Sequence, residues 1–223
     1  MVSIIIPTLD EAKLINKTLT QLSKLKGDFE IIVVDGGSHD ATRKIVEQHK
    51  VTLIKTDRGI PQQLTAGVLR AKYEKIFFLH ADSVLTQEAL ETLMHLDDDV
   101  MAGGFLHIYN KFHLLGSIQA IINNINARIF RRFGGEQGFF ITKDALSEAG
   151  GIPDVPVFEI EELCRRLRKN GTYPKILSGR VISNLRRFEK RGIRHFFKLN
   201  WAHSLYGLKI SHIRLKKHFP KIR

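Results

Sequence analysis

Residues 75–83 read KIFFLHADS, and this stretch decides the fold that we expect for the chain. Its apolar part, with two adjacent phenylalanines, is typical of a strand that is buried on both faces in a parallel sheet. The apolar run stops at His80 and Asp82. Polar side chains at the carboxyl ends of parallel strands lie at the edge where open α/β sheets bind ligands. A carboxylate at that edge suits a divalent cation, which is commonly shared between one or two carboxylates and substrate phosphates.

Asp82 has an alternative role as the cap of the helix that follows it. Thr86 is the better cap, because it directly precedes the apolar-periodic run that begins at Gln87. We therefore favour a binding site at Asp82 over a capping role.

Segments typical of strands and of helices alternate on both sides of this stretch. Apolar, β-branched runs at 2–6, 29–34 and 51–54 predict strands, and helical spacing of apolar residues follows each of them. This alternation predicts βαβ units and a mostly parallel sheet. The pattern loosens after Asp99, where 100–109 indicates a strand and 112–133 a long helix. We predict one α/β domain over 1–185, with an irregular second half, and a basic helical extension over 186–223.

The composition indicates a globular protein of a reducing compartment. The 223 residues suffice for one large domain, and 43% of them are hydrophobic. The one cysteine, Cys164, excludes an intramolecular disulfide and favours the cytoplasm. No apolar run reaches the roughly 18 residues that a membrane-spanning helix needs.

The net charge of +12 is concentrated at one end of the chain. Residues 186–223 contain twelve Lys or Arg and one acidic residue, whereas 1–185 contain 23 basic and 22 acidic residues. A basic tail indicates an anionic partner, which can be phosphate, the inner face of an acidic membrane or nucleic acid. Aromatic residues in the tail permit an amphipathic helix at a membrane surface, and a helix that closes the domain's own core explains them equally well.

A second carboxylate, Asp35, follows the strand at 29–34 and precedes two glycines. Glycines let a ligand approach the backbone, and an acidic residue at this place can bind a ribose or a base. The loop at 7–11 lacks the G-x-G-x-x-G pattern and no P-loop occurs, so a dehydrogenase or an ATPase is disfavoured. Nucleic acid is the least favoured partner, because Asp35 and Asp82 would repel phosphate unless a cation intervened. A simple turn explains Asp35 to Ser38 without any function.

Four segments, in order, resemble the motifs of the family 2 glycosyltransferases, which have the GT-A fold. They are 2–11 (VSIIIPTLDE), 31–42 (IIVVDGGSHDAT), 59–68 (GIPQQLTAGV) and 78–83 (FLHADS). The resemblance is greatest to a short branch with HAD in the metal motif and a later segment like 183–187 (SNLRR). Asp10 and Thr65 replace usual asparagines, and His80 replaces the first Asp of the usual DxD.

The resemblance implies a Rossmann-like GT-A sandwich and a metal-dependent, inverting transfer of sugar from a nucleotide-diphosphate donor. It implies that Asp82 holds Mg²⁺ or Mn²⁺, which would offset the charge on the leaving diphosphate. His80 would orient Asp82 or a phosphate, although a packed strand-end histidine is an equal alternative. The nucleotide-binding residues that it implies are Pro7, Thr8, Glu11, Asp35, Gly36, Arg58, Gln63, His80 and Ala81.

Two further segments resemble the acceptor and diphosphate side of this family. Residues 134–138 (GGEQG) resemble its acceptor loop, so Glu136, Gln137 and Gly138 would face the sugar or the acceptor. A glycine-rich turn before a strand at 139–141 explains the same residues without function. Arg186 and Arg187 would clamp the diphosphate, since guanidinium groups match phosphate oxygens.

The acceptor hydroxyl needs a general base, which the family supplies from a Glu-Asp pair at the beginning of a late helix. The matching segment is 156–167 (PVFEIEELCRRL), in which Glu159 aligns with the Glu and Ile160 replaces the Asp. The missing Asp leaves an alternative, a protein that binds nucleotide sugars but transfers them slowly or not at all.

Helical spacing selects a substitute for the missing base. Ile160 belongs to an apolar stripe that faces the core. Glu161 and Glu162 can each pair with an arginine four residues later, which is an ordinary surface role. Glu159 has Leu163 at that position and is the carboxylate left over at the helix start. We therefore rank Glu159 first and Glu161 second as the base.

Overall fold

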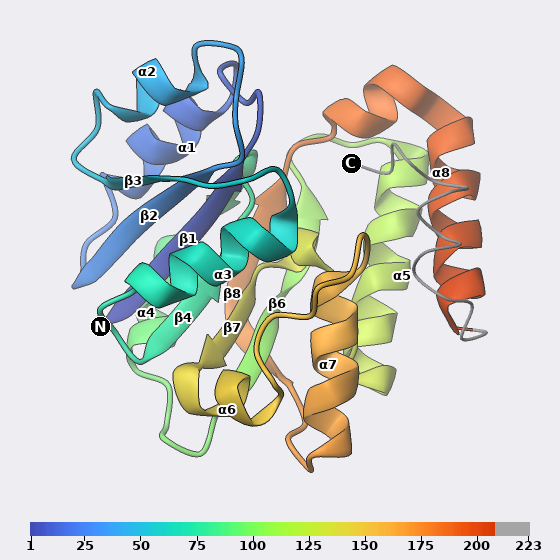
Figure 1. Ribbon diagram of the computed structural model, residues 1–223. Coiled ribbons are helices and arrows are strands. Elements are labelled where there is room, and N and C mark those ends of the chain that lie inside the picture. The colour runs from blue at the N-terminus through green and yellow to red at the C-terminus, as the bar shows by residue number, and fades with distance from the viewer. Residues whose placement is uncertain (208–223) are drawn as a thin grey trace.

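The structure is a computed structural model and describes residues 1–207, apart from the side chains of 187, 188, 190, 191, 195, 199, 204, 205 and 207. In this part of the chain, eight strands form one sheet in the order β3-β2-β1-β4-β7-β6-β8-β5. Figure 1 shows helices on both faces of the sheet and two long helices, α5 and α8, along one side. The predicted mixed α/β architecture with a mostly parallel sheet is confirmed.

The first half of the sheet is parallel and follows the expected alternation with helices. Strand β1 pairs with β2 on one side and with β4 on the other, and β2 pairs with β3. Every residue of β1 is buried, because helices cover both faces of this half. The four strands are β1 (Val2–Thr8), β2 (Phe29–Asp35), β3 (Thr52–Lys55) and β4 (Lys75–Phe78).

The second half of the sheet mixes directions. Strand β7 is antiparallel to both β4 and β6, β8 is parallel to β6, and β5 is antiparallel to β8. The sequence reading predicted β6 and β7 but not β5, which is very short, or β8, whose pairing with β6 shifts register beside Gly179. The strands are β5 (Ser83–Leu85), β6 (Ala102–Tyr109), β7 (Phe139–Thr142) and β8 (Lys175–Ser183).

Two hydrophobic cores lie on opposite faces of the sheet. Successive residues of β1 alternate between them, Ile4 and Ile6 in one and Ile5 in the other. The first core includes residues of α1 (Ile15–Leu22), α2 (Thr42–Val46) and α4 (Gln87–Met94). The second includes residues of α3 (Ile60–Arg70), α6 (Lys143–Glu148) and α7 (Glu159–Lys169). The chain therefore builds a three-layer sandwich around the strand that the 75–83 stretch contains.

Helices α5 (Leu114–Phe130) and α8 (Arg186–Gly207) form the side of the molecule beyond β6. The Nδ1 atom of His113 accepts a hydrogen bond from the amide of Gly116 and caps α5. Helix α8 contains one non-helical residue, Gly192, at φ 50° and ψ −141°. Its second part packs on the main body, where Ala202 is wholly buried.

The predicted extension over 186–223 begins where α8 begins, and residues 208–223 lie outside the described part. The division at 185/186 stays a prediction. Within residues 1–207, none of the helices combines the length and the apolar character that crossing a membrane requires.

Candidate functional site

The carboxyl ends of the parallel strands meet at one edge of the sheet. Thr8, the last residue of β1, is paired with Asp35, the last residue of β2, and Ile5 is paired with Phe78 at the end of β4. The segments that leave these three strands therefore share this edge. Asp35 and Asp82 lie there, as the sequence analysis expected.

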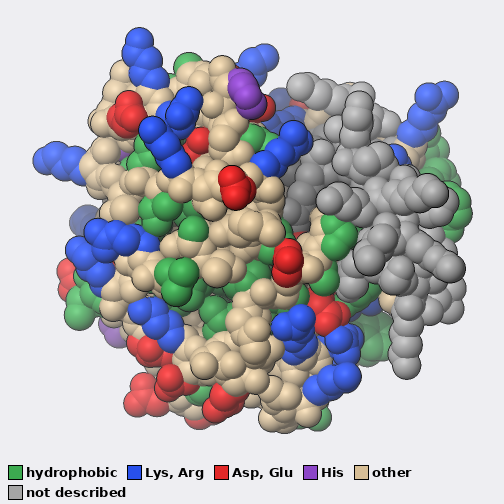
Figure 2. Space-filling view, viewed as in Figure 1, with side chains coloured by type: hydrophobic (Ala, Val, Ile, Leu, Met, Phe, Trp, Pro, Cys, Tyr) green, Lys and Arg blue, Asp and Glu red, His purple; other side chains and the backbone are tan. Residues whose placement is uncertain are grey.

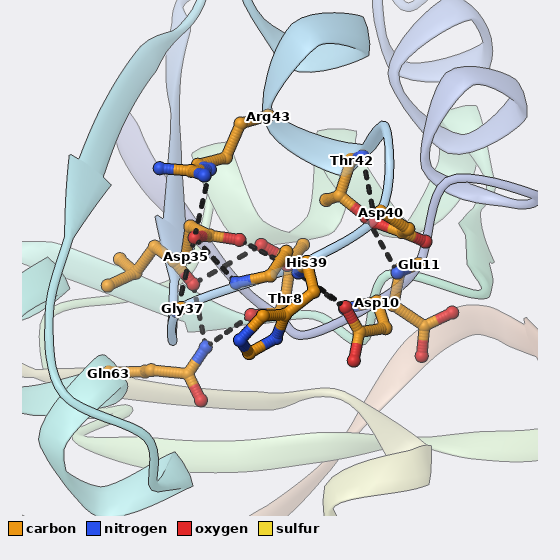
Figure 3. A network of polar contacts seen from close by, with 12 residues as sticks. Thr8, Asp10, Glu11, Asp35, Gly37, His39, Asp40, Thr42, Arg43 and Gln63 are labelled. Carbon is orange, nitrogen blue, oxygen red and sulfur yellow. Dashed lines mark hydrogen bonds and ion pairs between the residues drawn. The ribbon is translucent and has the colours of Figure 1, made fainter.

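Asp35 is held by the turn that follows it (Figure 3). One carboxylate oxygen, Oδ2, accepts hydrogen bonds from the amides of Gly37 at 3.1 Å and Ser38 at 3.0 Å. The other, Oδ1, accepts one from the Ser38 hydroxyl, and the Arg43 guanidinium lies 3.9 Å from Oδ2. These contacts fix the turn and leave acceptor capacity on Oδ1, because each carboxylate oxygen has two lone pairs.

Gln63 connects α3 to the ends of β1 and β2. Its Nε2 donates to the carbonyl oxygens of Thr8 at 2.8 Å and Val34 at 2.7 Å (Figure 3). A Cβ atom added to Gly36 would lie 3.0 to 3.1 Å from the Gln63 carboxamide. In this structure Gln63, predicted as a nucleotide contact, joins two strand ends with both of its amide hydrogens, and Gly36 leaves room for it.

The first loop is interlocked with the loop after β2 (Figure 3). Asp10 donates its amide to the Ser38 hydroxyl, and its Oδ1 accepts from the amide of His39. Glu11 donates its amide to the Thr42 hydroxyl at 2.8 Å. Asp10 has a positive φ of 54°, a conformation that Asp and Asn tolerate better than most residues. This explains why Asp can occupy the position where the resemblance expects Asn.

Three segments that are far apart in the sequence meet at the candidate site. Arg186 at the start of α8 places Nη2 2.5 Å from Oε1 of Glu11 and 3.2 Å from Oδ2 of Asp82. The Asp82 side chain is 10% exposed and that of Arg186 27%. Burial opposes the charge on Arg186, but the hydrogen bond with Glu11 and the charge of Asp82 outweigh it, so its pKa is raised. Two carboxylates thus gather around one permanent positive charge.

The same place fits a divalent cation that shares its ligands with phosphate. Oε2 of Glu11 is buried and has no hydrogen-bond partner among the described atoms, so one hard oxygen donor is unused. Asp82 supplies a second carboxylate, and Mg²⁺ or Mn²⁺ prefers such oxygen ligands. In residues 1–207 no cluster of three or more His, Cys, Asp or Glu could hold a metal alone. The residues therefore fit a cation that is completed by a diphosphate.

His80 packs against the short helix η1 (Gly135–Gln137). A Cβ atom added to Gly135 would lie 2.6 Å from Nε2 of His80, so the imidazole and this backbone are in close contact. Ala81 is 4% exposed, and its carbonyl oxygen accepts a hydrogen bond from the Thr18 hydroxyl. The HAD segment is thus fixed between α1 and η1.

The loop predicted to face the acceptor has a packing role in two of its three residues. Gln137 is 1% exposed, accepts a hydrogen bond from the Gly134 amide at 3.0 Å and donates one to the Phe105 carbonyl at 3.4 Å. Gly138 has φ 64°, and a Cβ there would lie 2.5 Å from the Phe77 ring. Glu136 accepts a hydrogen bond from the Tyr109 hydroxyl at 3.1 Å.

His107 on β6 is a buried histidine that was not predicted from the sequence. It is wholly buried, and within the described part of the chain neither ring nitrogen has a hydrogen-bond partner. Burial lowers its pKa, Glu136 acts in the opposite direction, and His80 lowers it further. The imidazole is therefore neutral and packs edge-on against Tyr109. A histidine at an inward-facing position of the predicted strand over 100–109 was the available signal.

The three glutamates at the start of α7 are buried, with exposed fractions of 3 to 5%. The predicted surface pairing of Glu161 with Arg165 is wrong. Its carboxylate instead lies 3.1 Å from the Arg132 guanidinium and 2.9 Å from the His203 ring, because α8 and the segment after α5 cover this helix start. Glu162, also expected at the surface, is buried. Its predicted pairing with Arg166 is present at 3.5 Å, and it pairs with Arg165 as well.

The packing of Ile160 and Glu159 bears on the choice of base. Ile160 is 3% exposed and faces the second core, as predicted. Glu159 is 4% exposed, so it is a buried carboxylate at the helix start. Glu161 contacts the Arg132 guanidinium and the His203 ring, and these contacts hold α7 to its surroundings.

The remaining candidates lie at the same edge or outside the described side chains. Pro7 and Thr8 are buried at the end of β1. Arg58 is exposed in the connection between β3 and α3. The side chain of Arg187 is outside the described residues.

Comparison with known proteins identifies similar sequences. A model of the family described as Glycosyl transferase family 2 matches residues 3–146. The chain is 32% identical over 99 residues to the Staphylococcus aureus (strain Mu50) poly(ribitol-phosphate) beta-N-acetylglucosaminyltransferase TarS, which covers 40% of this chain and 17% of that protein. It is 29% identical over 123 residues to the poly-beta-1,6-N-acetyl-D-glucosamine synthase of S. aureus strain COL, covering 50% of this chain and 30% of that protein. The chain therefore spans less than a third of the length of these curated relatives.

Solved structures share the fold. The mannosyltransferase PcManGT from Pyrobaculum calidifontis, in complex with GDP-Man and Mn²⁺, matches with a TM-score of 0.68 and 22% identity, covering 90% of this chain and 60% of that chain. S. aureus TarS residues 1–349 in complex with UDP-GlcNAc match with a TM-score of 0.63 and 20% identity, covering 82% and 58% of the two chains. The predicted GT-A fold class is confirmed.

Proposed function

This chain belongs to glycosyl transferase family 2, and from that premise we propose that it transfers a sugar from a nucleotide-diphosphate donor to an acceptor hydroxyl, with inversion at the sugar carbon. The single observation that carries the proposal is the meeting of Glu11, Asp82 and Arg186 at the carboxyl edge of the parallel strands. That edge is where α/β sheets bind nucleotides. The solved relatives with GDP-Man and UDP-GlcNAc support the class of donor.

Asp82 and the unused oxygen of Glu11 are the groups that would hold Mg²⁺ or Mn²⁺ together with the diphosphate. Such a cation stabilises the negative charge that develops on a leaving diphosphate. Arg186 supplies a permanent positive charge at the same place, and a guanidinium can bind two phosphate oxygens at once. Asp35, fixed in its turn, would accept a hydrogen bond from the nucleoside through the free capacity of Oδ1.

Glu159 is our choice for the group that takes the proton from the acceptor. Ile160 is buried in the core and has no proton acceptor, and the family resemblance aligns Glu159 with the Glu of the usual Glu-Asp pair. Glu159 lies at the start of α7, and α7 packs against η1, the loop that the family resemblance assigns to the acceptor side. Proton removal by a positioned carboxylate typically contributes about 10²- to 10⁴-fold to the rate.

A thermal-shift screen of nucleoside diphosphates with and without Mn²⁺ tests the proposal, because a ligand that binds the folded state raises the melting temperature. We expect one diphosphate to raise it, and Mn²⁺ to increase the shift. Asp82→Asn should abolish the increment due to Mn²⁺. Asp98→Asn, at an exposed carboxylate of the segment between α4 and β6, is the matched control and should behave as the wild type.

Donor hydrolysis and transfer then separate the two candidate activities. Binding together with Mn²⁺-dependent release of the sugar supports a transferase. Binding without any release of the sugar favours the alternative, a catalytically weak nucleotide-sugar-binding protein, which the buried Ile160 at the usual position of the base also favours. Absence of any shift with every nucleoside diphosphate would reject both.

A further inference from the structure

Helix α5 carries its large apolar side chains on the face that points away from the body of the molecule. The inward face consists of small and polar residues, since Gly116, Gln119, Ala120 and Ala127 are buried. Five large residues recur at steps of three or four and therefore lie in one stripe along the helix. Their exposed fractions are 65% for Leu114, 37% for Ile118, 58% for Ile121, 46% for Ile125 and 67% for Ile129.

A second row of exposed apolar side chains lies on α8, which packs beside α5. Ile193, Phe197 and Trp201 recur at steps of four, with exposed fractions of 57%, 63% and 63%. The two helices lie side by side, and the Asn200 side chain donates to that of Gln119 on α5 at 2.8 Å. We call these eight side chains, five on α5 and three on α8, the α5–α8 apolar face. Figure 2 shows hydrophobic side chains at the right-hand edge, the side where Figure 1 places both helices.

Soluble proteins seldom expose a contiguous apolar surface of this kind without a partner for it. The packing of α5 does not explain why its large apolar residues lie on the exposed side. On the side that contacts β6, the carboxamide of Asn124 forms hydrogen bonds with the His107 backbone. The described fold therefore leaves the outward apolar side chains of α5 largely exposed.

The net positive charge of the chain lies in the two sequence segments that contain α5 and α8. Residues 110–135, which contain α5, include four Lys or Arg and no acidic residue. Residues 186–223, which contain α8, include twelve Lys or Arg and one acidic residue. The rest of the chain has 19 basic and 22 acidic residues. The net positive charge thus belongs to the two segments that carry the apolar face.

We propose that the α5–α8 apolar face docks on the surface of a bilayer that contains anionic lipids. Helices with an apolar face and a rim of Lys and Arg lie in the plane of the interface, with the apolar side chains at the boundary of the acyl chains. Basic residues next to the surface add attraction to acidic headgroups. Helix α5, with 17 residues and a polar inner side, lies on the bilayer and does not cross it.

A second copy of the chain is the weaker occupant, because a two-fold interface brings the same patch of both copies together. Each copy would then present its basic segments to the other, and like charges would repel. Residues 208–223 are a weaker occupant as well, since they contain six Lys or Arg and no acidic residue and would repel the other basic residues of 110–135 and 186–207. An anionic lipid surface complements both the apolar side chains of the α5–α8 apolar face and the positive charge of the segments that carry it.

The chain contains a single tryptophan, Trp201, which lies in the proposed face. Vesicles of phosphatidylcholine and phosphatidylglycerol should shift its fluorescence to the blue, and brominated lipids should quench it. Co-sedimentation with these vesicles should weaken as salt is raised, because the attraction between surface charges is screened. Vesicles of phosphatidylcholine alone should bind less.

The decisive variant replaces Ile121, Ile125 and Ile129 by Gln, and should partition to the vesicles at least tenfold more weakly. Leu69→Gln with Tyr173→Gln is the matched control, because these exposed apolar residues (83% and 63%) belong to other elements. Melting temperatures of all variants establish that they fold. None of these measurements uses the transfer reaction, so the result is independent of the proposed function.

Equal binding by the wild type and the triple variant, or no binding by the folded wild type, would overturn the proposal. Sedimentation equilibrium adds a further outcome. A wild-type dimer that the triple variant dissociates, without vesicle binding, would assign the face to a second copy. A gain of vesicle binding on deletion of 208–223, with none in the full chain, would assign it to that segment.

Discussion

Single residues at the start of α7 show how similar side chains acquire different roles. Glu159, Glu161 and Glu162 are neighbours in the sequence and are all buried. Glu161 is held by Arg132 and His203, and Glu162 by Arg165 and the Tyr206 hydroxyl. Arg132, His203 and Tyr206 come from other segments of the chain, so neighbouring carboxylates on one helix have different surroundings.

Glu159→Gln should lower the rate of sugar transfer by about 10²- to 10⁴-fold, because the amide cannot accept the proton. Nucleotide binding, measured by thermal shift, should stay near the wild-type value. Glu161→Gln is the informative partner, and we expect it to cost about 1–3 kcal/mol of unfolding free energy because Arg132 loses its charged partner. If Glu161→Gln abolished transfer while Glu159→Gln kept it, the two assignments would be exchanged.

His107 makes the stability of the protein depend on pH. Its pKa in the folded state is lowered from 6.5, mainly by burial. Below pH 6.5 the unfolded chain therefore binds a proton that the folded chain resists, and this contribution to stability, complete above pH 6.5, is lost as the pH falls. Glu136 and His80 are the charged or titratable groups that also act on it.

His107→Phe should flatten the fall in melting temperature between pH 7 and pH 5. The ring edge against Tyr109 is retained, and in the described structure no side-chain hydrogen bond is lost. His95→Gln, at an exposed histidine, is the control and should keep the wild-type slope. An unchanged slope in His107→Phe would mean that another group controls the acid response.

At the scale of elements, the packing of α4 on β8 depends on one glycine. Gly179 has φ 101°, and a Cβ there would lie 2.7 Å from the backbone Cα of Ala89 on α4. Because the contact is with the backbone, the helix must move to make room. The close approach of α4 to the sheet fixes the position of β8. Strand β8 pairs with β5, which begins directly after Asp82.

Gly179→Ala should lower the unfolding free energy by about 1–3 kcal/mol beyond the cost of its backbone conformation, through overpacking. Gly171→Ala is the matched control, since Gly171 has φ 86° with no atom within 4 Å of its added Cβ. Urea unfolding of both variants gives the difference. Equal losses in the two would show that the contact with α4 adds nothing.

At the scale of the whole molecule, the start of α8 contacts the first loop of the chain. Arg186 reaches Glu11 in the first loop and Asp82 after the central strand, while the rest of α8 packs on α5 and α7. The basic extension thus contributes Arg186 to the candidate site. It also contributes three exposed side chains to the α5–α8 apolar face.

Arg186→Ala should lower the unfolding free energy of the ligand-free protein by about 1–3 kcal/mol, since two partly buried carboxylates lose their positive partner. Mn²⁺ should restore more stability to this variant than to the wild type, because the carboxylates are then open to a cation. Arg70→Ala, at an exposed arginine at the end of α3, is the control. No loss in Arg186→Ala would show that the ion pairs contribute nothing measurable.

The sequence by itself determined the parallel half of the sheet, the family and the edge at which Asp35 and Asp82 lie. Buried runs such as 75–79 are local signals, and the carboxyl ends of parallel strands meet at one edge whatever surrounds them. Only the tertiary structure decided that Gln63 joins strand ends, that Glu161 is buried against Arg132, and that α5 turns its isoleucines outward. Those outcomes depend on which distant segments of the chain pack against each surface. Helical or strand periodicity shows on which face of an element a residue lies, but it does not show which segment packs against that face.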